Sequence, residues 1–330
     1  MEFKEFKAGK DDDGRRLDRV IRIFLKDLSL GEIYKLLRKG LIKLNYKKSK
    51  PDTHVNSGDI ISIAAFLFST PSEPSKTTSS TSLSPFKLNI VFENEHLLII
   101  DKPYGRSVHG SEKVNLEGLD KDVLAFYEER LKEKACSEQE KSLSFRPGPL
   151  HRLDRNTSGL LAFSLSLEGA HWFSESIKNH TVSKKYYGLA EGCLKNEEEW
   201  EDKLADSGST EEGFYTVSQN ENGQTAKTFV KPLAWGKLKE KPVTLVEYTI
   251  KTGRKHQIRA QSQLHGHPLA GDKAYGGHQN PELKREYYLQ AYSLSFPEDN
   301  PLKLPQVIKI PLANDFQELL RSCEIENPGL

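Results

Sequence analysis

The sequence of 330 residues has only three cysteines and no long apolar run. Because the cysteines lie far apart and are odd in number, neither a disulfide framework nor a clustered zinc site is expected, and a reducing cytoplasm fits their usage. The longest apolar stretch, residues 60–68, is far shorter than the roughly 20 residues that span a bilayer. No apolar segment suited to secretion opens the chain, and no Gly-rich nucleotide loop follows. We therefore expect a cytoplasmic protein without a membrane span or a bound metal.

Charge is divided unevenly along the chain, although the net charge is only +1. Residues 1–50 hold 15 Lys and Arg against 8 Asp and Glu, whereas the other 280 residues hold 33 against 39. A basic end on a mildly acidic body is expected where one module holds a polyanion. A solvent-exposed charged surface with no partner is the alternative.

The basic end has the pattern of a small folded module. Apolar residues recur at helical spacing through residues 17–28 and predict an amphipathic helix. Ser29 followed by Glu32 forms a capping-box pattern for a second helix, which Gly40 ends. Short strands fit residues 41–45 and 60–64. We predict a helix-helix-strand module over residues 1–66.

The rest of the chain predicts a linker and an α+β domain. Residues 67–86 are rich in Ser, Thr and Pro without apolar periodicity, as is typical of a flexible linker. From residue 87 on, short strand patterns outnumber helical ones. We expect strands over residues 90–92, 97–100, 160–164, 185–189, 228–231 and 244–250, and helices over 119–134 and 170–178. This order predicts a mixed, mainly antiparallel sheet with flanking helices over residues 87–330.

The run His-Arg-Leu-Asp-Arg-Asn-Thr-Ser-Gly-Leu-Leu at residues 151–161 sets Asp154 between two arginines. These cations favour the ionised form of the carboxyl group. The Asn-Thr-Ser-Gly that follows is typical of a tight turn, and the apolar residues after it predict a buried strand. On local chemistry alone, a weak surface ion pair beside a turn is the favoured interpretation.

The same run resembles the His-Arg-Leu-Asp-x-x-Thr-Ser-Gly signature of the RluA-type RNA pseudouridine synthases. Residues 184–188 are similar to the family's Lys-x-Tyr-x-Ala motif, with Gly188 in the place of alanine, and residues 252–259 match Thr-Gly-Arg-x-His-Gln-Ile-Arg. Residues 102–109 and 266–276 resemble two further family motifs. Gln261 and Gln290 depart from the pattern, since many members have histidine at both places.

The resemblance implies a reaction in which uridine within RNA is isomerised to pseudouridine, with no cofactor. Asp154 would act on the ribose, Tyr186 would pack on a base flipped out of its stack, and Arg259 would orient Asp154. Asp154 either attacks the anomeric carbon as a nucleophile or removes a proton from the adjacent carbon, and both routes stay open.

The first module is similar to the alpha-L-type RNA-binding module that often precedes RluA-type catalytic domains. Since phosphate contacts dominate RNA affinity, we predict that this module binds RNA through Arg15, Arg16, Arg38, Lys39 and Lys43. The resemblance of the later motifs implies further RNA contacts by Lys102, His109, Arg152, Arg155, Arg254 and His256.

The basic module favours large-subunit ribosomal RNA as the target, and so does the Val-His-Gly-Ser run at residues 108–111, which resembles the ribosomal members of the family. Transfer RNA is the alternative substrate, and a catalytically silent RNA-binding or ribosome-assembly factor is the alternative class. We expect a monomer that needs neither a membrane nor a small-molecule cofactor.

Overall fold

The structure is a computed structural model that describes residues 1–25, 28–68, 87–110, 118–133, 142–209, 215–281 and 283–325. The predicted linker lies outside the described residues from position 69 on, as does Ser111. The chain divides into two compact units. The first unit comprises Met1–Lys87, Asp122–Pro147 and Leu165–Glu168, and the second comprises Leu88–Lys121, Gly148–Ser164 and Gly169–Leu330. The domain boundaries predicted from the sequence stay a prediction.

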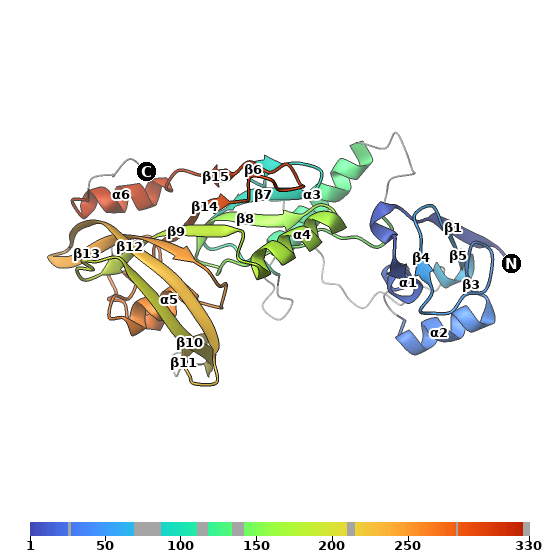
Figure 1. Ribbon diagram of the computed structural model, residues 1–330, viewed down its shortest axis with the longest axis horizontal. Coiled ribbons are helices and arrows are strands. Elements are labelled where there is room, and N and C mark those ends of the chain that lie inside the picture. Colours follow the sequence, from blue (N-terminus) through green and yellow to red (C-terminus); the bar gives the residue numbers. More distant parts are fainter. Residues whose placement is uncertain are drawn as a thin grey trace. The chain divides into compact units, whose positions relative to one another are not determined.

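The first unit pairs a small sheet with two helices (Figure 1). Three antiparallel strands, β1 (Phe3–Lys7), β5 (Ile60–Ala64) and β3 (Ile42–Leu44), form the sheet in that order, and β2 (Arg15–Arg16) pairs with β4 (His54–Val55). The helices are α1 (Leu17–Phe24) and α2 (Leu30–Lys39), with short 3-10 turns at Lys10–Asp12 and Ala65–Phe68. Their apolar faces are fully buried against the sheet, which explains the helical spacing of the apolar residues.

Helix α2 begins and ends where its sequence predicts. The hydroxyl of Ser29 accepts a hydrogen bond from the backbone N–H of Glu32, and the Glu32 carboxylate accepts one from the backbone N–H of Ser29 at 2.8 Å. Gly40 ends the helix with a φ of 72°, in the left-handed region that glycine adopts most easily. The predicted capping box is therefore confirmed.

A ten-stranded sheet forms the centre of the second unit. Its order is β11-β10-β12-β13-β9-β14-β8-β7-β6, and β15 also pairs with β14. The strands are β6 (Ile90–Glu93), β7 (Leu97–Lys102), β8 (Ser158–Ser164), β9 (Ser183–Glu191), β10 (Glu198–Ser209), β11 (Tyr215–Gln219), β12 (Gln224–Leu238), β13 (Lys241–Ile250), β14 (Leu289–Ser295) and β15 (Val307–Lys309). Within the described residues, β14 and β8 are the one parallel pair of this sheet. The predicted α+β class with a mainly antiparallel sheet is confirmed.

Three helices lie wholly or mostly in this unit, α4 (Leu167–Lys178), α5 (Gln257–Leu264) and α6 (Asn314–Ser322), with a 3-10 turn at Lys273–Tyr275. Most of α3 (Leu119–Glu133) belongs to the first unit. Helix α6 packs its apolar side on residues such as Tyr187 and Leu189 of β9. Since side chains alternate along a strand, Lys184 and Tyr186 of β9 lie on the opposite face. No helix in the described part of the chain is long and apolar enough to cross a membrane.

The expected strands and helices of this unit all lie within observed ones or overlap them, but several elements are absent from the expectation. Strands β10, β11, β14 and β15 and helix α6 are among these. Strand β10 carries charged residues whose partners stand on β12, as in the Lys227–Glu201 ion pair. Such a strand is defined by its cross-strand neighbours, which a local pattern of hydrophobicity does not contain.

Candidate active site

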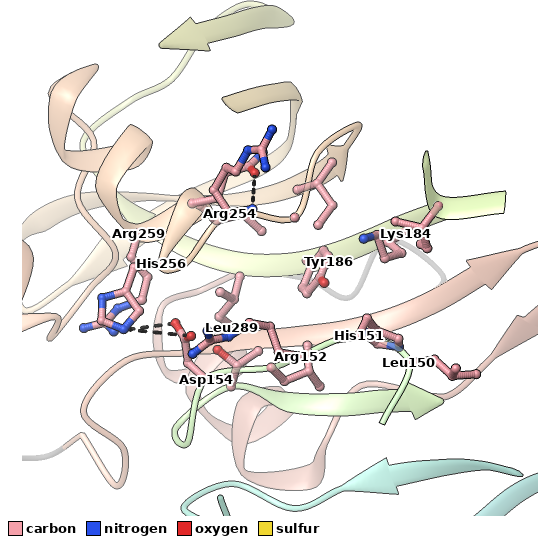
Figure 2. A pocket seen from close by; sticks show the side chains of 17 residues that line it. Leu150, His151, Arg152, Asp154, Lys184, Tyr186, Arg254, His256, Arg259 and Leu289 are labelled. Atoms are coloured by element: carbon pink, nitrogen blue, oxygen red, sulfur yellow. Dashed lines mark hydrogen bonds and ion pairs between the residues drawn. The ribbon is translucent and has the colours of Figure 1, made fainter. Parts of the chain in front are cut away.

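A cavity of about 300 Å³ lies over the middle of the large sheet. The loop before β8, the strands β9, β13 and β14, helices α4 and α5, and the loop before α5 all contribute to its wall. The three predicted catalytic residues, Asp154, Tyr186 and Arg259, all line it (Figure 2). Its volume is at the lower end of the range for small-ligand sites, which suits a single nucleoside unit.

Asp154 stands in the tight turn that leads into β8. The backbone carbonyl of Asp154 accepts a hydrogen bond from the N–H of Thr157 at 3.1 Å, and 15% of the Asp154 side chain is exposed. Two residues into β8, Gly159 has a φ of 109°, and a Cβ atom at this position would lie 2.1 Å from the carbonyl oxygen of Ala291. Glycine therefore lets the end of the turn approach β14 closely enough to pair.

Lys102 supports this turn from within the protein, which corrects its prediction as an RNA contact. The side chain is fully buried, and its Nζ donates hydrogen bonds of 2.7–3.0 Å to the carbonyl oxygens of Pro103, Arg106 and Arg155. Burial lowers the pKa of Lys102 to about 7. An ammonium group surrounded in this way joins the 102–106 loop to the Asp154 turn, and it cannot reach a phosphate outside.

Arg259, in the first turn of α5, has Asp272 as its main partner. Its Nε and Nη2 donate hydrogen bonds of 2.6 and 2.8 Å to the two carboxylate oxygens of Asp272, and both side chains are buried. The remaining nitrogen, Nη1, lies 3.7 Å from Oδ2 of Asp154. The guanidinium also lies over the rings of Tyr275 and Tyr287, 4.8 and 4.4 Å from their centroids. Arg259 is thus fixed by Asp272 and two aromatic faces, and it presents one N–H group to Asp154.

The loop before α5 is held in place by Gln257. Its side-chain oxygen accepts hydrogen bonds from the Arg254 backbone N–H and the Thr252 hydroxyl, and its amide nitrogen donates to the Lys227 carbonyl and the Thr228 hydroxyl of β12. This buried amide therefore explains why glutamine stands in the Thr252–Arg259 motif: it anchors the loop that starts the Arg259 helix to the sheet.

Tyr186 is a buried aromatic residue of β9, 5% exposed. Burial and the nearby Asp154 carboxylate both raise the pKa of its phenol, so the hydroxyl stays protonated at neutral pH. Two residues along the same face, a Cβ atom on Gly188 would lie 2.9 Å from the Tyr248 ring and 3.2 Å from Leu289. The glycine that replaces the family alanine therefore makes room for Tyr248.

His256 is a neutral neighbour of Asp154. Its Nε2 lies 3.9 Å from Oδ1 of Asp154, and its Nδ1 lies 2.9 Å from the Tyr275 hydroxyl. That hydroxyl accepts a hydrogen bond from the Val217 N–H, so its own proton is available to Nδ1, which leaves the imidazole proton on Nε2. Burial lowers the pKa of His256 to about 4, although Asp154 acts in the opposite direction. The ring is therefore uncharged at neutral pH and directs its N–H side toward the carboxylate.

The other predicted contacts of the second unit lie at the surface. Arg152 and Arg254 are exposed and line the cavity, and Arg254 also donates to the carbonyl of Thr225. Arg155 is exposed and donates to the Gly105 carbonyl at 3.0 Å. His109 is exposed with its ring 3.2 Å from the Asp120 carboxylate. All four keep side chains at or near solvent, where RNA can reach them.

The basic residues predicted in the first unit differ in their exposure and in whether another side chain of the protein binds them. Arg38 and Lys39 are exposed in the last turn of α2, and Lys43 lies over the Phe3 ring. Arg15 donates to the Ser144 hydroxyl, whereas Arg16 forms a two-bond pair with the buried carboxylate of Asp18. The charge of Arg16 is thus largely balanced within the protein.

Sequence reasoning missed two residues that hold Arg259 without lining the cavity, and two that line it. Asp272 and Tyr275 stand in a run that the family motif contains, but nothing local indicates that Arg259 is their partner. Lys184 and His151 line the cavity, although the sequence analysis gave neither of them a role beyond its place in a motif. In contrast, Gln261 and Gln290 are buried and bonded away from it, to Trp200, Asp202 and Ala226 and to Pro311 and Ala313. Within the described residues, no group of three or more His, Cys, Asp and Glu side chains is arranged to hold a metal ion.

Among the described residues that line the cavity, Asp154 supplies the one carboxylate, with Arg259 beside it and the buried Tyr186 in the same wall. Such an arrangement on this fold is that of an enzyme active site. Residues 96–264 match the family model described as RNA pseudouridylate synthase. The chain belongs to this family, in its RluA-type branch, and is an isomerase that acts on uridine in RNA.

Curated relatives and a solved structure extend this finding. A ribosomal large subunit pseudouridine synthase C of Vibrio vulnificus (strain CMCP6) is 26% identical over 95% of this chain and 94% of its own length. One from Vibrio cholerae is 29% identical over 81% of this chain and 78% of its own. The solved structure of the human RNA Pseudouridylate Synthase Domain Containing 4 has a TM-score of 0.56 at 21% identity and covers 73% of this chain and 95% of that one. At that identity it shows a shared fold.

Proposed function

We propose that this enzyme converts uridine to pseudouridine in large-subunit ribosomal RNA, with Asp154 as its catalytic carboxylate. The observation that carries the proposal is the convergence of Asp154, Tyr186 and Arg259 on one cavity, with Nη1 of Arg259 3.7 Å from Asp154. The ribosomal target is supported by the names of the relatives above, which match 95% and 81% of this chain.

In the proposed reaction the target uridine leaves its stack and enters the cavity, with its base against Tyr186. Asp154 either adds to C1′ of the ribose or removes the proton of C2′, and in both routes the bond from C1′ to N1 breaks. The electron pair stays on the uracil, which turns and forms a bond from C5 to C1′. As this bond forms, the ester bond from Asp154 to C1′ breaks in the first route, and the removed proton returns to C2′ in the second. C5 then loses its proton and N1 gains one, so no oxidant, reductant or group donor is consumed.

The surrounding residues have separate tasks in this proposal. Arg259, held by Asp272, keeps Asp154 in place through one N–H group. Arg152 and Arg254 at the mouth of the cavity contact RNA phosphates, and the exposed cations of the first unit add further phosphate contacts.

The proposal is tested with Asp154→Asn, which alters the carboxylate and little else. We expect no pseudouridine from this variant on unmodified large-subunit ribosomal RNA, while its thermal melting and its dissociation constant for RNA stay as in the wild type. Substantial product from the variant would refute the role of Asp154. Pseudouridine mapping of total RNA from a strain without this gene identifies the target, and lost sites in transfer RNA alone would overturn the ribosomal assignment.

A further inference from the structure

A second cationic side chain lines the cavity beyond Tyr186. Lys184 precedes Tyr186 by two residues on β9, so both side chains lie on the same face of the strand. Lys184 is only 5% exposed, and Figure 2 shows it on the side of Tyr186 away from Asp154. A methyl group on Gly253 would lie 3.4 Å from Nζ, so the ammonium rests against the backbone of the loop before α5.

This ammonium has no partner within the part of the chain that the structure describes. No hydrogen bond or ion pair engages its Nζ, whereas the neighbouring Lys185 pairs with Glu247 at 2.9 Å and Lys102 donates to three carbonyl groups. Burial alone lowers the pKa of Lys184 to about 8. Because an unpaired buried charge destabilises a fold, its presence at a cavity wall points to an acceptor that comes with the substrate.

His151 adds a second unused donor at the same end of the cavity. Its Nε2 accepts a hydrogen bond from the backbone N–H of Ala162 at 3.1 Å, so the neutral ring carries its proton on Nδ1. Nδ1 is buried and has no partner among the described residues. Burial, followed by the nearby Lys184 ammonium, lowers the pKa of His151 to about 3. The ring is thus a neutral donor beside a charged one.

The uracil that the proposed reaction releases has the matching chemistry. When the bond from C1′ to N1 breaks, the electron pair delocalises over N1 and the two carbonyl oxygens of the ring. A fixed donor aimed at an oxygen where charge develops is among the largest contributions that a protein makes to catalysis. Cytosine carries an amino group in place of one carbonyl, so two donors at this place also favour uracil over cytosine.

We propose that Lys184 donates a hydrogen bond to a carbonyl oxygen of the flipped uracil and stabilises the negative charge of the detached base, with His151 as a second donor. This role rests on the proposed function, because it requires uracil to be detached in the cavity. Lys184 transfers no proton in it, so the bond changes of the isomerisation are unaltered.

The test compares Lys184→Met and Lys184→Arg with the matched control Lys185→Met, which alters the next lysine of β9 on its opposite face. Single-turnover formation of pseudouridine on unmodified large-subunit ribosomal RNA gives the rate at saturating enzyme. We expect Lys184→Met to lower this rate by about 100-fold while the dissociation constant for RNA changes by less than about twofold. Lys184→Arg keeps part of the rate because it keeps the charge, and Lys185→Met leaves the rate unchanged.

Two further measurements separate a catalytic lysine from a structural one. Removing an unpaired buried charge raises stability, so the melting temperature of Lys184→Met should exceed that of the wild type. The wild-type rate should also fall as the pH rises through about 8, and this fall should be absent in Lys184→Arg. The other charged side chains that line the cavity are Asp154, Arg152, Arg254 and Arg259, and its other titratable ones are His151, His256 and Tyr186. Both histidines are neutral in that range, and Tyr186 stays protonated because burial raises the pKa of its phenol.

Three results would overturn the inference. An undiminished rate for Lys184→Met means that the lysine has no part in the chemistry. A weaker dissociation constant with a shallower salt dependence, at an unchanged saturating rate, would make Lys184 a phosphate contact instead. If the wild-type enzyme forms no pseudouridine, the proposed function and this inference both fail. If the wild-type enzyme forms pseudouridine and Lys184→Met forms it equally fast, only this inference fails.

Discussion

Arg259 holds Asp272 through two short hydrogen bonds and touches Asp154 with its one remaining terminal nitrogen, at 3.7 Å. The guanidinium therefore joins a structural carboxylate to the proposed catalytic one. Rings of Tyr275 and Tyr287 lie against the guanidinium, so its rotation would require both aromatic side chains to move. Asp272, Tyr275 and Tyr287 thus fix the guanidinium that lies beside Asp154.

Asp272→Asn should expose this dependence. The change leaves Arg259 buried with half of its pairing lost, which costs about 3 kcal/mol of unfolding free energy. It also frees the guanidinium to turn toward Asp154, and a displacement of this kind lowers the rate by about 100-fold. Urea unfolding and single-turnover kinetics measure the two effects.

Asp206→Asn is the control for Asp272→Asn, because Asp206 pairs with Lys255 at the surface. It should cost less than about 1 kcal/mol and leave the rate unchanged. An Asp272→Asn variant with wild-type turnover would show that Asp154 needs no positioning through Arg259.

Tyr186→Leu should weaken RNA binding. Stacking of a base on an aromatic side chain contributes about 1–3 kcal/mol, so the dissociation constant should rise by about tenfold or more. Filter binding in an Asp154→Asn background measures this without turnover. In the same background, Tyr186→Phe should bind like tyrosine, since the ring face is retained. Equal affinity of the leucine and phenylalanine variants for RNA would show that the base does not stack on the Tyr186 ring.

Stability should fall with acidification through His256. Burial lowers the pKa of this ring to about 4, from an ordinary value of 6.5, so the unfolded chain binds more protons between those two pH values. The unfolding free energy therefore falls as the pH drops from 6.5 to 4, by on the order of 3 kcal/mol from this group. His256→Gln cannot titrate and should lose this part of the pH dependence.

The three tryptophans, Trp172, Trp200 and Trp235, all belong to the second unit, so their fluorescence reports its unfolding in urea titrations. Parallel pH profiles of the unfolding free energy for wild type and His256→Gln would contradict the assignment of a buried neutral imidazole.

Gly159→Ala should prevent the pairing of β8 with β14. The backbone has a φ of 109° there, and the added methyl group would lie 2.1 Å from the Ala291 carbonyl oxygen. We expect a loss of more than about 4 kcal/mol, the range that marks disruption of a core contact. Gly266→Ala is the control, because its φ of 77° is also left-handed but the space around it is open.

The control should cost only about 1 kcal/mol of backbone strain. Comparable losses of soluble protein for both variants would show that backbone strain, and not the contact with Ala291, makes glycine necessary at position 159.

Much of the fold follows from local sequence, as α2 illustrates. Its capping residues, its apolar face and its final glycine act within a few residues of each other, so the sequence suffices to place the helix. Asp154, Tyr186 and Arg259 were predicted as a group because each stands in a family motif. Their shared cavity agrees with that expectation, whereas their chemical roles stay a prediction.

The parts that could not be predicted depend on distant contacts. Nothing near Lys102 indicates that three carbonyl groups will surround it, one of them on Arg155. The family motif in its loop therefore suggested a contact with RNA. Likewise, Asp272 pairs with an arginine thirteen residues earlier across a turn, and the motif that contains it does not name its partner. Strand β14 has no distinctive periodicity because it is buried on both faces between β9 and β8.

The placement of β14 between β9 and β8 has a consequence for synthesis of the enzyme. Tyr186 stands on β9 and Asp154 leads into β8, so the two residues become neighbours only after β14 has inserted between their strands. The parallel pairing joins Ser158–Gly159 to Gln290–Ala291, and contacts between such distant segments form late. The wall of the cavity is therefore complete only after the chain has been made as far as β14, which supplies Leu289.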